Sequence, residues 1–349
     1  MSVPTMKDVA REAGVAVGTV SKVFNQIPVG ESYRQRVLDA AGKLGYQVNS
    51  YARGLKTNKT YAVALIIPNI INPFFSALAE NVCQALTRRG YRMILSVTDC
   101  DMDAEERFIR MAKQNRVDGI IGLTYNPSLC VDDDLPYVSF DRYFSPGVPC
   151  VASDNYGGGC MAAEKLLERG CRRLLYFRHG SVVPGETDKR GDGFETVCRR
   201  ENVCYEKVWL NDRDSAERFR EFLCRHMADG VPEYDGIFCS TDDLAFAVLR
   251  MLSEMGIRVP EEVQIIGYDG IPVFVSGELP CSTIVQPVEQ MAETAVSLLL
   301  EADRSCPQGL VCLPVRYAAG GTTKEDASAA GTKGTEKKET ESGQWQANI

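Results

Sequence analysis

Polar side chains follow several short apolar segments of the chain, at the points where each segment ends. They occur in Pro68-Asn69, Phe140-Asp141, Ser240-Thr241-Asp242 and Tyr268-Asp269. If the apolar segments are parallel strands, these side chains gather at the carboxyl ends of the strands, where open α/β sheets bind ligands. An aspartate at such a position can instead cap the following helix. Both interpretations stay open for Asp242 and Asp269.

The spacings typical of common enzyme classes are missing. The chain has two histidines, His179 and His226, and no Gly-x-Ser-x-Gly elbow. No Gly-x-Gly-x-x-Gly follows the first apolar segment, and "YGGGC" does not match a phosphate-binding loop. The thirteen cysteines form no Cys-x-x-Cys pair of the kind that zinc sites use. We therefore expect a binding protein and not an enzyme, with no cofactor and no metal.

Residues 61–324 alternate between short apolar segments and amphipathic ones. "YAVALIIPN" is followed by "PFFSALAENVCQALTRRG", "YRMILSVTD" is followed by "DAEERFIRMAKQNR", and a second set begins at "RRLLYFRHG". Strands rich in Val, Ile and Leu that alternate with helices are typical of parallel, doubly wound sheets. Because the units are too many for one compact sheet, we predict an α/β fold with two similar lobes.

The first sixty residues are basic, although the chain is acidic. They hold nine lysines and arginines against four acids, a net charge of +5, whereas the whole chain has a net charge of −8. Such asymmetry suggests a small nucleic-acid module on a larger acidic body.

Three short helices are predicted in this basic region. A capping box formed by Thr5 and Asp8 begins the first helix. Gly14 permits a turn with positive φ before the second helix, at about 17–25. The third helix spans about 31–44, and Gly45 ends it.

The apolar runs are far too short to span a bilayer, and the N-terminus has no apolar stretch of the signal-peptide type. The odd number of cysteines then favours reduced thiols in the cytoplasm. From residue 325 to 349 the chain is small, polar and charged, and we interpret it as a disordered tail.

The chain resembles the lactose/galactose repressor (LacI/GalR) family along most of its length. The headpiece motifs are "TMKDVAREAGVAVGTVSKVFN", "ESYRQRVLDAAGKLGY" and "YARGLKT", and the body motifs include "SFDR", "ASDNYGGG" and "VQIIGYDG". The resemblance covers residues 5–324. It implies a helix-turn-helix headpiece over 1–48, a hinge helix or linker over 49–60, and a two-lobed sensor over 61–324 that is similar to periplasmic sugar-binding proteins.

In this family the second headpiece helix enters the major groove and the hinge helix enters the minor groove. The matching positions are Thr5, Val17, Gly18, Ser21, Lys22, Asn25, Asn49, Ala52, Leu55 and Lys56. Lys22 could donate to guanine, and Val17 could contact a thymine methyl group. Leu55 matches a leucine that wedges between base pairs.

Two positions of the headpiece and hinge depart from the family pattern. Ala16 stands where a serine commonly caps the second helix, and Val48 stands where a proline usually precedes the hinge.

The resemblance also implies an effector site between the lobes. The matching positions are Asn72, Phe74, Asp141, Arg142, Arg190, Phe238, Thr241, Asp269 and Gln286. Carboxylates and guanidinium groups can bind adjacent hydroxyls bidentately, and a ring can cover the C–H face of a pyranose. The set suits a sugar, although a purine or another metabolite stays an alternative. Phe75 is assigned to the core.

We therefore expect a cytoplasmic, sequence-specific transcriptional regulator, most simply a homodimeric repressor of carbohydrate-utilisation genes. It would bind double-stranded operator DNA with an affinity that a small sugar-like effector switches, and it would not associate with membranes. One alternative is a regulator that responds to a purine or a protein corepressor. Another is a cytoplasmic sugar sensor that has lost DNA binding.

Overall fold

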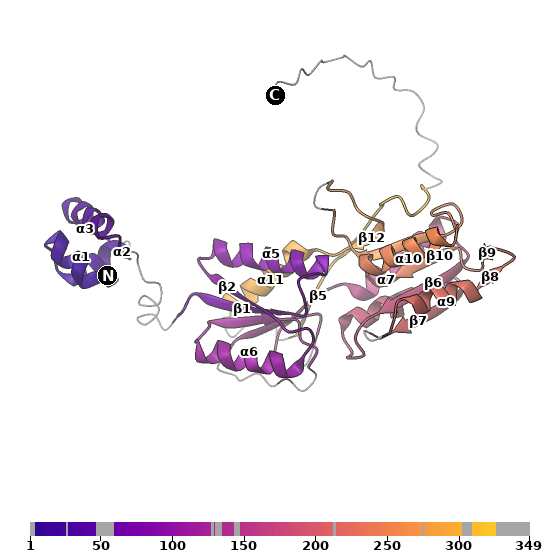
Figure 1. Ribbon diagram of the computed structural model, residues 1–349, viewed down its shortest axis with the longest axis horizontal. Helices are drawn as coiled ribbons and strands as arrows, with labels where there is room; N and C mark the ends of the chain where they lie inside the picture. Colours follow the sequence, from indigo (N-terminus) through magenta and orange to yellow (C-terminus); the bar gives the residue numbers. More distant parts are fainter. Residues whose placement is uncertain are drawn as a thin grey trace, which may run out of the picture. The chain divides into compact units, whose positions relative to one another are not determined.

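The computed structural model describes residues 4–25, 27–46, 59–126, 129, 135–142, 147–211, 214–273, 276–301 and 309–325. The chain divides into two compact units, Met1–Tyr61 and Ala62–Ile349 (Figure 1). The four predicted hinge contacts, Asn49, Ala52, Leu55 and Lys56, lie outside the described residues, as does nearly all of the tail.

The first unit contains three helices, α1 (Met6–Ala13), α2 (Val17–Phe24) and α3 (Glu31–Leu44). The predicted capping box is confirmed, because the Thr5 amide donates to Asp8 Oδ2 at 2.9 Å and the Asp8 amide donates to Thr5 Oγ1 at 3.4 Å. Gly14 and Gly45 end α1 and α3 with φ of 62° and 63°. The small core of this unit consists of Val9, Ala10, Ala13, Val20, Val23, Val37, Ala40 and Ala41.

The second unit consists of two α/β lobes. In lobe 1 the strands follow the order β13-β5-β4-β3-β1-β2. They are β1 (Ala62–Ile67), β2 (Arg92–Val97), β3 (Gly119–Gly122), β4 (Tyr137–Phe140), β5 (Cys150–Ser153) and β13 (Leu310–Leu313), and all pair in parallel. The helices of this lobe are α5 (Pro73–Arg88), α6 (Met102–Gln114) and α11 (Val288–Leu300).

Lobe 2 repeats this architecture with the order β14-β12-β11-β10-β6-β7. Its strands are β6 (Arg173–His179), β7 (Cys204–Leu210), β10 (Gly236–Cys239), β11 (Gln264–Asp269), β12 (Ser282–Val285) and β14 (Arg316–Ala318). The predicted parallel sheets are confirmed, and the one exception among the described strands of the two lobes is β14, which is antiparallel to β12. It is the last strand of the described chain and returns along the edge of the sheet.

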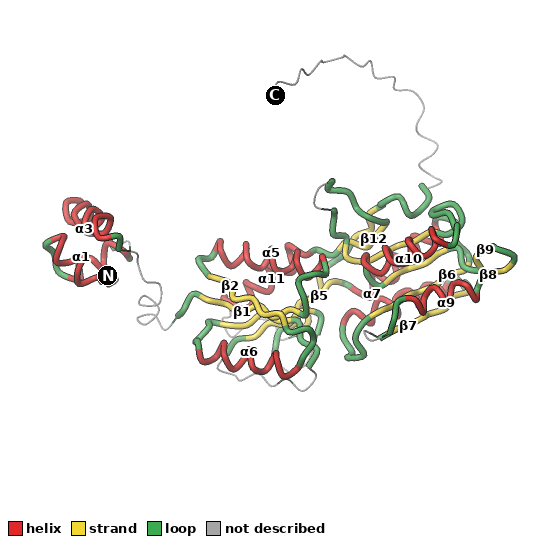
Figure 2. Tube along the Cα trace, in the orientation of Figure 1, coloured by secondary structure: helices red, strands yellow, loops and turns green. Residues whose placement is uncertain are grey.

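Helices cover both faces of the lobe 2 sheet, as the layers of Figure 2 show. They are α7 (Asn155–Glu168), α8 (Lys189–Arg200), α9 (Glu217–Arg225) and α10 (Asp242–Glu254), with a short 3₁₀ helix over Glu186–Asp188 and a small hairpin of β8 (Met227–Ala228) and β9 (Val231–Pro232). Leu174 and Tyr176 pack among residues of α7 and α8, whereas Leu175 and Phe177 pack among residues of α9 and α10. Burial on both faces explains why the centre of β6 is continuously apolar.

The chain passes between the lobes three times, after β5, after β12 and between β13 and β14. Ser153 ends β5 and Gln286 follows β12, so both side chains lie at crossings. Within the described ranges, no helix is both long and apolar enough to cross a membrane.

Candidate functional site

The helix α2 and its C-cap carry five of the ten residues that the sequence assigned to DNA. Val17 is 42% exposed, Gly18, Lys22 and Asn25 are also exposed, and Ser21 is half-buried. Nothing lies within 4 Å of the position that a side chain at Gly18 would take. The same helix buries Val20 and Val23 against the core. The helix therefore presents a short apolar and basic surface that can approach the edges of base pairs.

The start of α2 lacks a side-chain cap, as the sequence predicted. Ala16 occupies the N-cap position and makes no side-chain hydrogen bond there. The turn before it is held instead by Arg36 of α3, whose Nη2 donates to the backbone oxygens of Ala13 and Gly14 at 2.6 and 3.1 Å.

Replacement of Ala16 by serine is expected to stabilise the first unit by about 1 kcal/mol. The serine hydroxyl can accept a hydrogen bond from a backbone amide in the first turn of α2. Thermal unfolding of the headpiece, followed by circular dichroism, measures this gain. An Ala16→Val variant is the matched control, since it adds volume without an acceptor and should not stabilise the unit. Equal stability of the serine variant and the wild type would contradict the prediction that the missing cap costs stability.

A cavity of about 1130 Å³ lies between the two lobes. Segments that follow β1, β2, β3 and β4 line it from lobe 1, and residues at or just after the ends of β6, β7, β10, β11 and β12 line it from lobe 2. Eight of the nine predicted effector residues line this cleft, namely Asn72, Phe74, Asp141, Arg142, Arg190, Thr241, Asp269 and Gln286. The fold thus brings together side chains that are more than 200 positions apart in the sequence, from Asn72 to Gln286.

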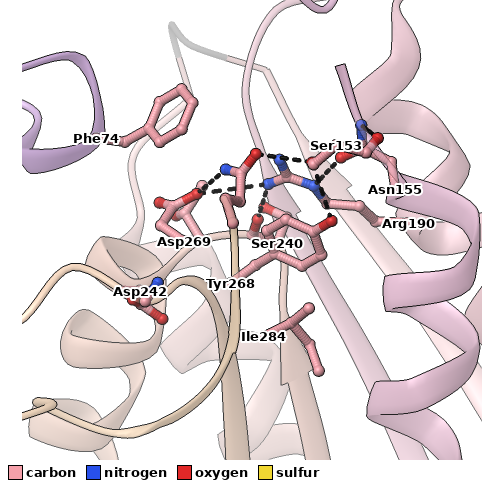
Figure 3. Close-up of polar contacts among 12 residues, drawn as sticks. Phe74, Ser153, Asn155, Arg190, Ser240, Asp242, Tyr268, Asp269 and Ile284 are labelled. Atoms are coloured by element: carbon pink, nitrogen blue, oxygen red, sulfur yellow. Dashed lines mark hydrogen bonds and ion pairs between the residues drawn. The ribbon is translucent and has the colours of Figure 1, made fainter. Parts of the chain in front are cut away.

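Arg190 is the centre of the polar network in the cleft (Figure 3). Its Nε donates to Asn155 Oδ1 at 2.7 Å, and one Nη donates to the backbone oxygen of Ser240 at 2.5 Å. The same Nη lies 3.9 Å from Asp269 Oδ1. The guanidinium carbon lies 3.6 Å from the centre of the Tyr268 ring. This buried side chain is therefore held by α7, β11 and the residue that follows β10.

Asp269 connects this network to two of the segments in which the chain passes between the lobes. Gln286 Nε2 donates to Asp269 Oδ1 at 2.7 Å, and Ser153 Oγ donates to Gln286 Oε1 at 2.8 Å. Burial raises the pKa of the Asp269 carboxyl, and the nearby positive charge of Arg190 opposes this rise. The carboxylate therefore depends on Arg190 for compensation of its charge.

Asp141 and Arg142 form the lobe 1 side of the cleft. Burial raises the pKa of Asp141, while Arg190 and Arg142 oppose the rise. Asp141 Oδ1 and Arg142 Nε are buried, and neither has a hydrogen-bond partner among the residues that the structure describes. One strong acceptor and one strong donor on consecutive residues thus remain for a ligand.

Phe238 corrects one prediction for the cleft. Its side chain is fully buried and packs against the rings of Tyr176, Phe194 and Tyr268 in the core of lobe 2. The residue lies within β10 and not beyond its end, so its ring enters the core and does not line the cleft. Phe74 and Phe75 both line the cleft, so Phe75, which the sequence assigned to the core, is half-buried at the cavity wall.

Two further residues at strand ends have roles within the fold. Thr241 lines the cleft but also caps α10, because its Oγ1 accepts the Leu244 amide at 3.2 Å. Asp242 is not the cap. Its buried carboxylate accepts from the Gly270 amide at 2.7 Å and from Thr283 Oγ1 at 2.6 Å, and so joins α10 to β11 and β12.

Four glycines that position Arg190 were missed in the sequence. A methyl group added at Gly159 of α7 would overlap the backbone oxygen of Arg190, and one added at Gly193 of α8 would overlap the backbone oxygen of Tyr156. Gly158 and Gly191 lie similarly close to the rings of Tyr268 and Tyr176. The signal was the pair of glycine clusters inside helical segments, since glycine is costly in helices without a packing reason.

No group of three or more His, Cys, Asp or Glu side chains that could hold a metal occurs in the described part of the chain. The arginines of the cleft are already engaged, Arg178 with Asp188, Arg190 with Asp269, and Arg142 with the backbone oxygen of Val183. The arrangement suits recognition of a neutral ligand with several hydroxyl groups.

Comparison with known proteins gives the same two-part organisation. Residues 5–49 match the model of bacterial regulatory proteins of the lacI family, and residues 163–323 match a periplasmic binding protein-like domain. Ribose operon repressors of Halalkalibacterium halodurans and Bacillus subtilis are each 34% identical to the chain, over 85% and 92% of it and over 89% and 99% of their own lengths.

A crystal structure of a periplasmic binding protein/LacI transcriptional regulator from Alkaliphilus metalliredigens, complexed with D-xylulofuranose, is also similar. It is 32% identical and covers 76% of this chain and all of the other chain, with a TM-score of 0.65.

Proposed function

The chain belongs to the lacI family of bacterial regulatory proteins, and we propose that it is a sequence-specific transcriptional repressor of carbohydrate-utilisation genes. Its operator affinity would be switched by a neutral sugar that binds between the two lobes. The repressor would act in the cytoplasm on double-stranded DNA.

The exposed face of α2 supports the DNA-binding part of the proposal. Lys22 supplies a positive charge next to the apolar Val17 and the open Gly18, on a unit whose net charge is positive in an acidic chain. We propose a homodimer, because two copies of such a small surface would read the two halves of a pseudo-palindromic operator. Leu55 would add a wedge in the minor groove.

The observation that carries the effector part is the pair of unused polar atoms at Asp141 Oδ1 and Arg142 Nε. A hydroxyl can donate to the carboxylate and accept from the guanidinium at the same time, whereas a phosphate oxygen could only accept. A pentose fits this pattern, and relatives are named for the ribose operon. The rings of Phe74 and Phe75 would cover its C–H face.

The position of the cleft explains how a sugar could act on DNA binding. The ligand would contact both lobes, so it would bind one relative orientation of the lobes more tightly than others. Any such preference must be matched by an equal effect of DNA on sugar affinity.

Fluorescence anisotropy with DNA from upstream of the protein's own gene tests the proposal. We expect at least about a 10³-fold preference over a scrambled duplex at physiological salt. Titration of that complex with D-ribose should change the operator affinity, and D-ribose 5-phosphate should have a weaker effect. Specific DNA binding without any response to neutral sugars would contradict the effector assignment, and no specific binding would contradict the repressor assignment.

Lys22→Ala is expected to weaken specific binding about tenfold or more, since one good base contact contributes about 1–3 kcal/mol. Lys43→Ala provides the matched control, because Lys43 lies on α3 and is paired with Glu12 at 2.5 Å. The control makes the same change in charge and should reduce specific and non-specific binding alike. Equal effects of the two variants on specificity would remove Lys22 from the recognition surface.

A further inference from the structure

A buried acid lies behind the lobe 1 wall of the cleft, outside the residues that line it. Glu105 of α6 is only 3% exposed, and its Oε2 accepts from Thr124 Oγ1 at 2.8 Å. Its Oε1 has no hydrogen-bond partner among the described residues. A carboxylate is rarely buried at such a place without a specific role, because burial penalises its charge.

The contact with Thr124 fixes the segment that follows β3. Thr124 Oγ1 accepts the Asn126 amide at 3.0 Å, so a short turn closes around Tyr125. Tyr125 lines the cleft, and its ring centre lies 4.4 Å from the guanidinium carbon of Arg142. The ring therefore supports the face of the guanidinium group.

Arg142 then reaches across to lobe 2. Its Nη1 donates to the backbone oxygen of Val183, and next to it the Glu186 amide donates to the backbone oxygen of Asp141 at 2.9 Å. A methyl group added at Gly185 would lie 2.5 Å from Arg142 Nη1, so the loop over residues 181–186 fits closely around this side chain. A continuous series of contacts thus joins α6 to lobe 2.

We infer that Glu105 is a positioning residue for the effector site, acting through Thr124 and Tyr125 on Arg142 and on the loop over residues 181–186. The inference rests on the proposed function in that Arg142 is taken to contact the sugar. Coupling of this kind needs a contiguous set of packed and hydrogen-bonded groups, which these residues provide.

Hydrogen–deuterium exchange of the full chain tests the inference without reference to the ligand. In Glu105→Leu, peptides that cover 123–126 and 181–186 should both exchange faster, because Thr124 loses its acceptor and Arg142 loses its support. Glu105→Gln keeps an acceptor oxygen and should restore wild-type exchange at both segments. Thr124→Val removes the donor instead and should reproduce the pattern of Glu105→Leu, even if the leucine variant does not fold.

Glu106→Leu is the matched control, since Glu106 is the neighbouring residue, accepts from the Asn126 side chain at 3.4 Å and otherwise forms an exposed ion pair with Arg110 at 3.5 Å. It should leave the loop over residues 181–186 unchanged. Faster exchange confined to 123–126 in Glu105→Leu and Thr124→Val would overturn the inference, since the role of Glu105 would then be local.

D-ribose binding, measured by calorimetry, separates this inference from the proposed function. We expect about a fivefold loss of affinity in Glu105→Leu and less than a twofold change in Glu105→Gln. If the wild type does not bind D-ribose while the exchange pattern appears as expected, the choice of effector fails and the role of Glu105 stands. Normal D-ribose affinity in Glu105→Leu would overturn that role.

Discussion

Replacement of Arg190 by alanine is expected to abolish measurable sugar binding and to lower the free energy of unfolding of the second unit by about 3–5 kcal/mol. Removal of this guanidinium leaves Asp269 without the positive charge that opposes the rise of its pKa. Asp141 loses its strongest charge compensation as well. The side-chain oxygen of Asn155 and the backbone oxygen of Ser240 lose a donor at the same time.

Arg190→Lys separates the loss of charge from the loss of geometry. Lysine keeps the positive charge but cannot donate in a planar fork to Asn155 and Ser240 together, so we expect partial recovery of stability and little recovery of sugar affinity. Calorimetry with D-ribose and urea unfolding measure the two effects.

Arg250→Ala is the control for these arginine variants. The Arg250 side chain is 76% exposed, and its one ion pair among the described residues is a long one, with Nε 3.8 Å from Glu254 Oε1. Its loss should cost less than about 1 kcal/mol and leave sugar binding intact. Sugar affinity of Arg190→Ala within threefold of the wild type would contradict a central role for this residue.

The sequence predicted most of the elements, because most of them have a strong local signal. Short apolar segments predicted β1 and β11, and a capping box predicted the start of α1. The antiparallel β14 was missed, since a strand of three residues with a half-exposed pattern has no clear periodicity.

Placement of the site residues depended on the resemblance to a family more than on local patterns. Asp141 and Asp269 stand directly at the ends of strands, and parallel topology brings such ends together. Phe238 could not be placed in the same way, because a difference of two or three positions along a strand decides between the core and the cleft. Glu105 had no signal at all, since a charged residue in an amphipathic helix is normally exposed.

The close packing of helix α7 against helix α8 could have been inferred from the glycines. This packing decides where Arg190 lies. Arg190 is the second residue of α8, and Gly159 of α7 faces its backbone. Backbone atoms cannot move away independently as a flexible side chain can. Any side chain at Gly159 must therefore push the two helices apart, and the guanidinium group moves with α8.

Gly159→Ala is accordingly expected to destabilise the second unit by about 3 kcal/mol, at the upper end of what a single added methyl group costs in a packed core. D-ribose affinity should fall by more than tenfold, although every polar residue of the cleft is retained. Gly193→Ala should behave alike, because it forces the same two helices apart from the other side. Urea unfolding and calorimetry measure both effects.

The matched control is Gly42→Ala, the same substitution in α3, where nothing lies within 4 Å of the added methyl group. It should stabilise the first unit by up to about 1 kcal/mol, since alanine is the better helix former, and it should not change sugar binding. The same chemical change would then have opposite signs at two helical glycines, and only backbone packing distinguishes them. If Gly159→Ala kept the stability and sugar affinity of the wild type, α8 would not depend on this packing, and the position of Arg190 would have to be set by its hydrogen bonds alone.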